Sequence, residues 1–272
     1  MSNTKSVPLC HEIDDISENL IVSPEIIQST LKTCKVYYKA NKSYFEVQLP
    51  EMTCPYGISD GILDPKTKKP LNENKATINL SLNNLERKSI SACKKMFEDL
   101  AEKVIEEATP NSGKWFNMPK LNKEVVRAFF RSNIKYAKKK DENGNPTGEI
   151  NEEYPPTLAF TLYKNDGLLN VDAEDGMGNK IDINGLNLKG ALVTPIVQLT
   201  GIWIGASMFG LTWKVLKLRV IPKSQNPSAY VFRDDMEGVL GGSELQETDE
   251  PMSMVKELPQ QTTMMNDSED ED

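Results

Sequence analysis

The sequence predicts a mainly β fold with one long helix, organised as an N-terminal polar arm (residues 1–30), a folded domain (31–222) and a disordered acidic tail (223–272). At least five segments alternate apolar and polar residues with a period of two, which is typical of half-buried strands. One stretch, residues 85–108, repeats apolar residues every three or four positions, as an amphipathic helix does. A change of composition at Pro222 separates the body from the tail.

The negative charge of the chain is concentrated in the tail. The formal net charge is −8, from 32 basic and 40 acidic residues. Residues 223–272 hold three basic and thirteen acidic residues, a charge of −10, so the remainder has 29 basic and 27 acidic residues and is nearly neutral. A segment of this composition lacks the apolar surface needed to order itself, which predicts disorder.

The longest apolar stretch, residues 190–222, predicts a β-hairpin. It is uncharged up to Trp213 and then alternates charged and apolar residues, which is the pattern of a half-buried strand. The glycine-rich segment 205–210 (GASMFG) is the predicted connection, because glycine allows the positive φ that tight turns need. Strict alternation places Trp213, Lys217 and Arg219 on one face of the second strand.

The same stretch is long enough for a membrane span, since about twenty uncharged residues can cross a bilayer. Pro195, Gln198 and several glycine and threonine residues lower its hydropathy, and no aromatic belt or basic flank precedes it. The interpretation as two strands of a soluble protein is therefore favoured, and no membrane partner is expected.

Further elements are predicted along the body. Residues 33–49 predict two short strands around a turn, and residues 76–82 (ATINLSL) predict another strand. The helix at 85–108 ends before Pro110 and is expected to pack across one side of a sheet. Residues 171–183 predict a glycine-bearing hairpin turn rather than an ion-binding loop, because the ligand spacing of an EF-hand is absent.

Residues 113–140 hold nine cations and one anion, Glu124, with five aromatic residues between them. Read as a strand from Val125 onward, the even positions are mostly apolar and the odd positions mostly basic, which favours a strand with one basic face. A helix stays open as the alternative, since short apolar runs are ambiguous. Residues 156–163 (PTLAFTLY) are the expected partner strand.

The residues offer little for catalysis. The one histidine, His11, lies in the N-terminal arm, so the body has no Ser-His or Cys-His pair. Neither a phosphate-binding loop (G-x-x-x-x-G-K-[ST]) nor a dinucleotide fingerprint (G-x-G-x-x-G) is present. The four cysteines are widely spaced without a C-x-x-C pair, which argues against a zinc site. The sequence therefore predicts a protein that is not an enzyme and uses no cofactor or metal.

Cations placed among aromatic residues on β-strands predict binding of single-stranded nucleic acid. Cations neutralise phosphates, while exposed rings stack on unpaired bases with about 1–3 kcal/mol per base. The alternative is that the aromatic residues belong to the core and the lysines to a solvated surface. The candidate residues are Lys114, Trp115, Lys120, Arg127, Phe129, Arg131, Lys135, Tyr136, Lys139, Trp203, Trp213, Lys217 and Arg219.

Three stretches carry a family resemblance: YFEVQLPEMTCPYGIS at 44–59, INLSL at 78–82 before the helix, and GLNLKGALVTPIVQLTGIWIGASMFGLTWKVLKLRV at 185–220. Their most specific parts are the P-x-x-x-x-P-Y-G loop and the W-x-G-x(4)-G-x-x-W-K-V block. Over about residues 33–222, the chain resembles the single-stranded DNA-binding proteins of the nucleocytoplasmic large DNA viruses. That family is similar in turn to the single-stranded DNA-binding proteins of certain tailed phages.

The resemblance implies an oligonucleotide/oligosaccharide-binding (OB) barrel with insertions and a helix between strands. Such a protein binds single-stranded DNA without sequence preference in viral DNA replication, recombination or repair. The resemblance also implies that the acidic tail contacts replication proteins, and the last acidic residues are Glu269, Asp270, Glu271 and Asp272. A homo-oligomer is compatible with these features. The competing interpretation is a structural or scaffold protein of a virion or replication compartment, whose basic patch binds an acidic protein instead of DNA.

The N-terminal residues predict an intracellular protein. They are polar and acidic where a secretory signal needs an apolar run, so export is not expected and the cysteines are expected to be reduced. With the family resemblance, the expected location is the cytoplasmic replication site or the nucleus of a host cell, or the virion.

Overall fold

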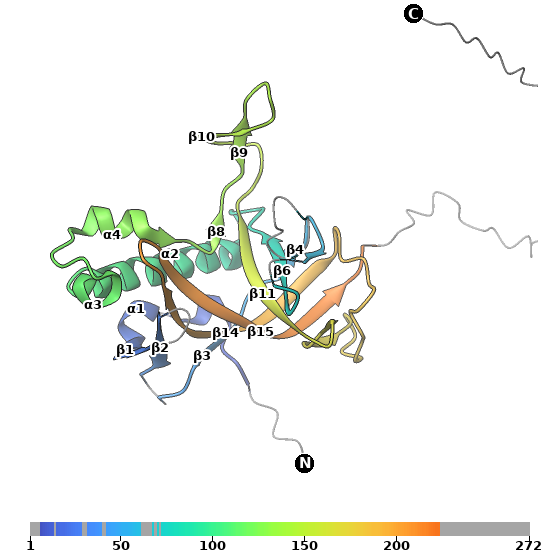
Figure 1. Ribbon diagram of the computed structural model, residues 1–272. Helices are drawn as coiled ribbons and strands as arrows, with labels where there is room; N and C mark the ends of the chain where they lie inside the picture. The colour runs from blue at the N-terminus through green and yellow to red at the C-terminus, as the bar shows by residue number, and fades with distance from the viewer. Residues whose placement is uncertain are drawn as a thin grey trace, which may run out of the picture. The chain divides into compact units, whose positions relative to one another are not determined.

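The two longest strands form the hairpin that the sequence predicts. β14 (Leu192–Ile204) and β15 (Phe209–Ile221) pair antiparallel along their length, and residues 205–208 connect them (Figure 1). From Val193 to Leu199, buried side chains alternate with partly exposed ones, as a strand with one face in the core requires. The hairpin therefore contributes one of its faces to the hydrophobic core.

The computed structural model describes residues 6–13, 15–28, 32–39, 42–60, 67, 70 and 72–223. Within them, thirteen strands form one sheet and two strands form a second. Apart from Lys223, the acidic tail predicted at 223–272 lies outside the described residues, and so do Glu269, Asp270, Glu271 and Asp272.

Five strands close into a barrel. β14 pairs with β15, β15 with β11 (Thr157–Asn165), β11 with β6 (Lys75–Ser81), and β6 with β4 (Met52–Thr53), which pairs back to β14. β3 (Phe45–Gln48) and β5 (Ile58–Ser59) extend β4 on either side into one bent first strand. Only β11 and β15 are parallel among these neighbours. This is the strand order of an OB barrel, and the predicted mainly β, OB-like fold class is confirmed.

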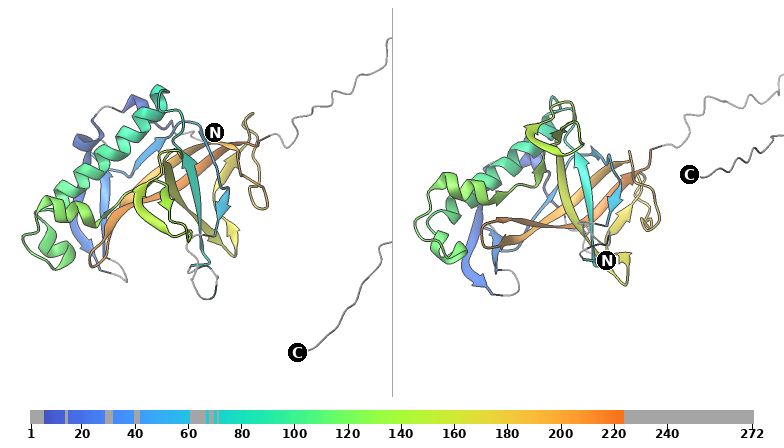
Figure 2. Two further views of the ribbon diagram at one scale, coloured as in Figure 1. Left: turned by 90° about the horizontal axis from the view of Figure 1, so that it is seen from above. Right: turned by 45° about the horizontal axis from the view of Figure 1, so that its top comes forward.

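The predicted long helix, α2 (Lys88–Ala108), lies between the second and third barrel strands in sequence and covers one side of the sheet (Figure 2). Phe97 is central to this contact, because its ring centroid lies 6.0 Å from that of Phe160 on β11 and 5.0 Å from that of Trp213 on β15. The opposite side of α2 is charged and carries i,i+4 ion pairs such as Lys94–Glu98. The apolar stripe thus binds the helix to the barrel.

A β-bulge in β15 changes the predicted faces of this strand. Leu216 has no partner in the register between β14 and β15. An extra residue reverses the alternation of side chains, so Trp213 points into the core before the bulge and Leu218 points into the core after it. Lys217 and Arg219 point outward. The prediction that Trp213 shares a face with Lys217 and Arg219 is therefore wrong.

The predicted strand that starts at Val125 begins instead as a short helix, α4 (Lys123–Phe129). Asn122 caps this helix, because its Oδ1 accepts a hydrogen bond from the backbone N–H of Val125 at 2.9 Å. One turn of α4 also faces α2, where Arg127 binds Glu102. The cap and the ion pair stabilise a helix in a segment whose alternation was compatible with either structure.

Two short strands follow α4 and join the barrel. β7 (Phe130–Arg131) runs parallel to the start of β15, and β8 (Ile134–Lys135) pairs antiparallel with the start of β11. The predicted pairing between the basic stretch and residues 156–163 is thus confirmed at β8 alone, and the main partner of β11 is β6.

Smaller elements complete the unit. β9 (Lys138–Lys140) and β10 (Pro146–Ile150) form an arm that projects from the barrel, which we call the β9–β10 arm (Figure 1). After β13 (Asp172–Glu174), the chain turns between Asp175 and Asn179, which confirms the predicted hairpin turn. The others are β12 (Leu168–Leu169), α3 (Ser112–Phe116), the 3-10 helix Cys10–Glu12 and α1 (Ile16–Asn19).

Part of the segment expected to be a polar arm belongs to the sheet. β1 (Leu20–Ile27) pairs antiparallel with β2 (Lys32–Tyr38), and β2 pairs with the end of β14. The apolar residues of β1, such as the buried Leu20, therefore extend the sheet beyond the barrel.

Gly201 of β14 lies where little space is left for a side chain. A Cβ atom there would lie 2.3 Å from the carbonyl oxygen of Cys34 on β2. Gly201→Ala is therefore expected to push β2 away from β14 and to lower the free energy of unfolding by about 1–3 kcal/mol, the usual cost of overpacking. Urea unfolding measures this change. The matched control is Gly148→Ala on β10, where no atom lies within 4 Å of the added Cβ. Equal midpoints for the two variants would show that the contact between β2 and β14 is not tight.

Candidate nucleic-acid interface

Three cations without a carboxylate partner share one outward face of the sheet. Arg131 of β7 pairs in register with Gly210 of β15, and Lys214 lies four residues further along β15. Lys135 of β8 pairs with Thr157 of β11. In the described part of the chain, no aspartate or glutamate forms an ion pair with any of the three cations.

The strand register fixes the spacing of these cations. Lys214 pairs with Thr161 of β11, which lies four residues beyond Thr157, the partner of Lys135. At about 3.3 Å per residue, four residues span about 13 Å. Between Thr157 and Thr161, the outward side chain of β11 is that of Ala159, which is small and lies between the buried Leu158 and Phe160. The cations therefore surround a patch where a polymer backbone can approach the sheet.

Trp203 of β14 lies beside Arg131 on the same face. A Cβ atom on Gly210 would lie 2.9 Å from Nε1 of the indole and 2.8 Å from the carbonyl oxygen of Arg131. The indole thus crosses the neighbouring strand at a glycine, where no side chain displaces it. Trp203 is partly exposed, whereas its neighbours Ile202 and Ile204 are buried. Arg131, Lys135, Lys214 and Trp203 form a surface that we call the cationic face.

Within the described ranges of the chain, no carboxylate compensates the charges on the cationic face. Partial burial lowers the pKa of Lys135, and the positive charge of Arg131 lowers this pKa further. Arg131 donates from Nη1 to the carbonyl oxygen of Ala128 at 3.2 Å, and this partner carries no net charge. Like charges held close together in a partly desolvated place destabilise each other. A bound phosphate would relieve this repulsion, so the face suits an anionic ligand.

Two predicted cations on β15 are neutralised. Lys217 and Arg219 both bind the carboxylate of Glu174 on β13, and Nη2 of Arg219 lies 2.6 Å from its Oε1. Hydrogen bonds from Lys217 and then from Arg219 lower the pKa of Glu174. The carboxylate side chain is only 12% exposed, so this ion-pair cluster joins β13 to β15. A phosphate that contacts these two cations would have to compete with Glu174.

Two further predicted cations also have carboxylate partners. Nζ of Lys139 in the β9–β10 arm lies 3.0 Å from Oε2 of Glu149, and Arg127 of α4 binds Glu102 of α2 with its Nη1 at 2.7 Å from Oε2. Lys123 binds the same glutamate, Glu102. Arg127 therefore joins two helices and is not one of the unpaired cations.

The ion pair between α2 and α4 predicts a pH dependence. Hydrogen bonds from Arg127 and Lys123 lower the pKa of Glu102 to about 2. A lowered pKa in the folded state adds stability above the unfolded value of about 4.3, and this stability is lost as the pH falls toward the folded value. Arg127→Gln is expected to lower the free energy of unfolding at pH 7 by less than about 1 kcal/mol, since the pair is exposed.

Urea unfolding of the wild type and of Arg127→Gln at pH 7 and pH 3 checks this dependence. The difference between the two proteins is expected to be smaller at pH 3, because Glu102 is then mostly protonated in both unfolded states and part of the stabilisation by its lowered pKa is already lost. A difference that stays constant between the two pH values would show that the ion pair does not stabilise the contact between α2 and α4.

Two of the predicted stacking residues are buried. Trp115 is 4% exposed and Trp213 is 2% exposed. The Trp213 ring packs 5.0 Å from Phe97 and 6.4 Å from Phe45. The prediction that Trp115 and Trp213 stack on bases is therefore wrong, because their rings are part of the core. Phe129 is half-buried, and its ring centroid lies 5.5 Å from that of Phe116.

The remaining predicted residues are exposed but are not all brought together. Lys114 lies on α3, Lys120 lies between α3 and α4, and Tyr136 follows β8. Tyr136 directly follows Lys135 in the chain, so it lies at the edge of the sheet where the cationic face ends. No pairing or hydrogen bond in the described residues connects Lys114 or Lys120 to that face.

Sequence reasoning missed Lys214 and Tyr154. Lys214 follows Trp213 in an alternating strand, so an inward Trp213 would have implied an outward Lys214. Tyr154 is 57% exposed in the turn-rich segment before β11. The signal there was an aromatic residue in a polar, proline-containing segment, where no core position is expected.

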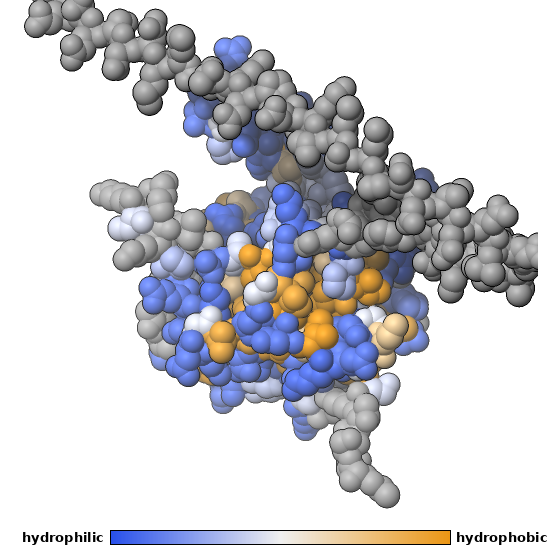
Figure 3. Space-filling model, turned by 90° about the vertical axis from the view of Figure 1, so that its right-hand side faces the viewer, coloured by the Kyte–Doolittle hydropathy of each residue, from blue (hydrophilic) through white to orange (hydrophobic). Residues whose placement is uncertain are grey.

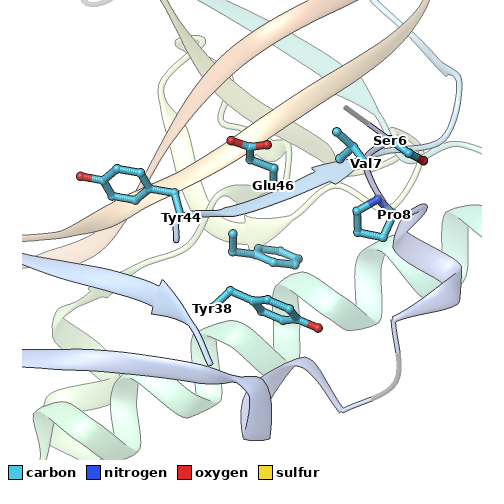
Figure 4. A pocket seen from close by; sticks show the side chains of 7 residues that line it. Ser6, Val7, Pro8, Tyr38, Tyr44 and Glu46 are labelled. Atoms are coloured by element: carbon cyan, nitrogen blue, oxygen red, sulfur yellow. The ribbon is translucent and has the colours of Figure 1, made fainter. Parts of the chain in front are cut away.

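Two other surfaces are less suited to an anionic polymer. A hollow of about 130 Å³ near the N-terminal segment is lined by Tyr38, Tyr44 and the carboxylate-bearing Glu46 (Figure 4). Figure 3 shows a face where apolar side chains gather among hydrophilic ones. Leu192 at the start of β14 and Ile221 at the end of β15 pair with each other, and both are exposed apolar residues.

Neither a metal site nor a membrane-spanning helix is found in the described residues. No group of three or more histidine, cysteine, aspartate or glutamate side chains among them could hold a metal ion. None of the helices in this part of the chain is long and apolar enough to cross a membrane.

Comparison with known proteins finds likenesses among solved structures. No protein-family model and no curated protein matches the chain. The structural neighbours are phage single-stranded DNA-binding proteins. One is gp2.5, a single-stranded DNA-binding protein encoded by bacteriophage T7, with 14% identity and a TM-score of 0.39 over 68% of this chain and 90% of that protein.

A second neighbour is the single-stranded DNA-binding protein of bacteriophage Enc34. In complex with single-stranded DNA, it shows 13% identity and a TM-score of 0.39 over 75% of this chain and 98% of its own. At these identities and TM-scores, the likeness assigns neither a family nor an activity to this chain. The resemblance to proteins of the large DNA viruses stays a prediction.

Proposed function

We propose that this chain binds single-stranded DNA without sequence preference, through the cationic face. The observation that carries the proposal is the combination of the partly exposed Trp203 with three cations that have no carboxylate partner among the described residues, Arg131, Lys135 and Lys214. Other proteins bind single-stranded DNA with this combination, because the cations follow the backbone while aromatic rings stack on the bases. No base-specific hydrogen-bonding arrangement is required, so every sequence is a ligand.

The position of the face in the barrel supports this proposal. OB barrels bind oligonucleotides with the outer face of their second and third strands and with the loop between the fourth and fifth. Here the third strand is β11, and the loop between the fourth and fifth strands is residues 205–208. Trp203 and Gly210 flank this loop, and Thr161 on β11 pairs with Lys214.

Single strands are favoured over duplexes because of Trp203. An indole on the surface stacks on a base only when that base is not already stacked within a double helix. The cations alone would attract both forms of DNA. The cationic face is therefore expected to bind a single strand more tightly than a duplex of the same sequence.

Fluorescence titration with labelled oligonucleotides tests the proposed function. The oligonucleotide is about 20 nucleotides long, which exceeds the usual OB site sizes of about 4–16 nucleotides. Single-stranded DNA is expected to bind at low salt, and the duplex is expected to bind more weakly. If neither form binds, the proposed function is wrong; if an acidic protein binds instead, the scaffold interpretation replaces it.

The sequence resemblance supports the proposal that this activity serves viral DNA replication, recombination or repair. On this proposal, the protein acts by binding rather than by catalysis, at the cytoplasmic replication site or in the nucleus of the host, or is carried in the virion. Its further partners would be replication proteins that bind the acidic tail, and a homo-oligomer would fit a protein that coats a strand.

Deleting residues 223–272 is expected to tighten binding of single-stranded DNA at low salt. This segment carries a charge of −10 on the same chain as the cationic face, so it competes with DNA phosphates at a high effective concentration. Salt screens this competition, since the Debye length falls to about 8 Å at physiological ionic strength. Fluorescence titrations of the full-length and truncated proteins at two salt concentrations measure the effect. If the full-length and truncated proteins bind with equal affinity at low salt, the tail does not compete with DNA and its charge serves solubility alone.

A further inference from the structure

A hollow of about 380 Å³ lies at the base of the β9–β10 arm, outside the cationic face. Its walls are mainly apolar and unusually exposed. Tyr136 is 41% exposed, Tyr154 57%, Ile150 43% and Leu85 44%. Pro155 and other residues before β11 complete the lining. Large apolar side chains that gather on the surface in this way mark a binding site.

Backbone hydrogen bonds hold the walls of the hollow in place. The N–H of Asn151 donates to the carbonyl oxygen of Ala137 at 2.9 Å, which closes the base of the arm. The N–H of Leu82 donates to the carbonyl oxygen of Pro156 at 2.8 Å, which ties the start of β11 to the end of β6. The hollow is therefore formed by the fold of three chain segments, and its tyrosines are held near one another before any ligand binds.

The hollow begins where the cationic face ends. Tyr136, in its wall, directly follows Lys135 of the cationic face. Thr157, the first residue of β11, pairs with Lys135, and the residues before Thr157 line the hollow. The hollow therefore lies at the edge of the sheet beside Lys135, within reach of a single strand that continues past the cationic face.

We infer that this hollow is a second base-binding site, which takes one or more nucleobases of the strand bound on the cationic face. This inference rests on the proposed function. The rings of Tyr136 and Tyr154 offer stacking surfaces, which suit every base because every base has a π-face. At the rim, the side-chain amides of Asn83 and Asn84 and the carboxylate of Glu152 can hydrogen-bond the edges of a base.

Two lysines close to Tyr136 in the chain can hold the phosphate backbone of a nucleic acid at the hollow. Lys135 precedes Tyr136 and Lys138 follows it two residues later, so cations flank the ring on both sides along the chain. Nζ of Lys138 donates to the carbonyl oxygen of Gly148, and among the described residues it has no carboxylate partner. A phosphodiester backbone between stacked bases fits this arrangement.

The test compares a short and a long oligonucleotide on the double variant Tyr136→Ala/Tyr154→Ala. The long strand, of about 16 nucleotides, can cover the cationic face and the hollow, whereas a strand of about 4 nucleotides covers only one of them. The affinity of the double variant for the long strand is expected to fall about tenfold or more, since stacking on two rings is lost. Its affinity for the short strand is expected to stay near that of the wild type, because the short strand prefers the unaltered cationic face.

Two controls make the result specific. Tyr136→Phe/Tyr154→Phe keeps both rings and is expected to bind both strands like the wild type. Leu168→Ala removes an equally exposed apolar side chain, 60% exposed, from β12 and is expected to change neither affinity. Urea midpoints of all variants confirm that they are folded.

The possible outcomes separate this inference from the proposed function. If the wild type binds neither strand, both are wrong. If the wild type binds both strands and the alanine double variant binds each of them as tightly as the wild type does, the inference alone is wrong. The hollow is then a site for an apolar protein segment. If the double variant loses the same factor for both strands, the tyrosines belong to the primary interface and the hollow is not a second site.

Discussion

Reversing two charges on the cationic face, Arg131→Glu with Lys135→Glu, is expected to weaken binding of single-stranded DNA at low salt by at least about tenfold. The logarithm of the binding constant for a single strand changes with the logarithm of salt concentration by about −0.7 per phosphate neutralised, so loss of two contacts makes this slope shallower by about 1.4. The fold should survive, because neither side chain has an ion-pair partner among the described residues to lose. Fluorescence titrations over a range of salt concentrations measure both effects.

The control for this variant carries the same change of charge elsewhere. Lys95 is on the exposed side of α2, and Lys180 is an exposed residue near β13 that lies 3.7 Å from Asp172. Lys95→Glu with Lys180→Glu alters the net charge equally but leaves the cationic face intact. If both double variants lose the same affinity, binding follows total charge and not this face.

Replacing Trp203 by alanine should lower the affinity for single-stranded DNA by about 1–3 kcal/mol per stacked base, or roughly five- to 150-fold in Kd. Its indole is the half-buried one of the three tryptophans, whereas Trp115 and Trp213 are 4% and 2% exposed. DNA is therefore expected to quench the fluorescence of Trp203 alone.

Single phenylalanine substitutions locate the quenching. Trp203→Phe should remove most of the fluorescence change on adding an oligonucleotide, while Trp213→Phe should retain it. Trp203→Phe should also keep more affinity than Trp203→Ala, because a phenyl ring still stacks. Quenching that disappears in Trp213→Phe would mean that the core around Trp213 opens on binding, and that Trp203 is not the stacking residue.

Local patterns predicted the fold well where a whole element repeats its pattern. The apolar stripe of α2 and the long alternation in β14 and β15 each extend over many residues, so an error of one position does not change the interpretation. The closure of the barrel was not accessible from such patterns. It depends on the parallel pairing of β11 with β15, which joins Thr161 to Lys214 although the two residues are far apart in the sequence. The family resemblance, not the periodicity, supplied the OB topology.

The failures in the site have two physical causes. One extra residue, Leu216, reverses the faces of β15, and a bulge of this kind depends on the register with β14, which the sequence of one strand does not contain. The second cause is pairing between residues far apart in sequence. Arg219 meets Glu174 across 45 positions and Arg127 meets Glu102 across 25, so a list of cations cannot separate paired from unpaired ones.

Three residues of the cationic face had been predicted from composition and resemblance: Arg131, Lys135 and Trp203. The structure adds the reason why they form one surface. β7 and β8 are inserted beside the starts of β15 and β11, and Gly210 leaves room for an indole at that point. Lys214 then completes the surface because Trp213 points into the core.

Photo-cross-linking of the full-length protein to a single-stranded oligonucleotide, followed by identification of the cross-linked peptides, tests the location of the interface most directly. The oligonucleotide carries a photoreactive base at each position in turn. Cross-links are expected in the segment around Trp203 and in the segment from Arg131 to Tyr136, and competition with unlabelled single strands should remove them. Cross-links confined to β13 with Lys217 and Arg219, or to the surface around Tyr38 and Tyr44, would contradict binding at the cationic face.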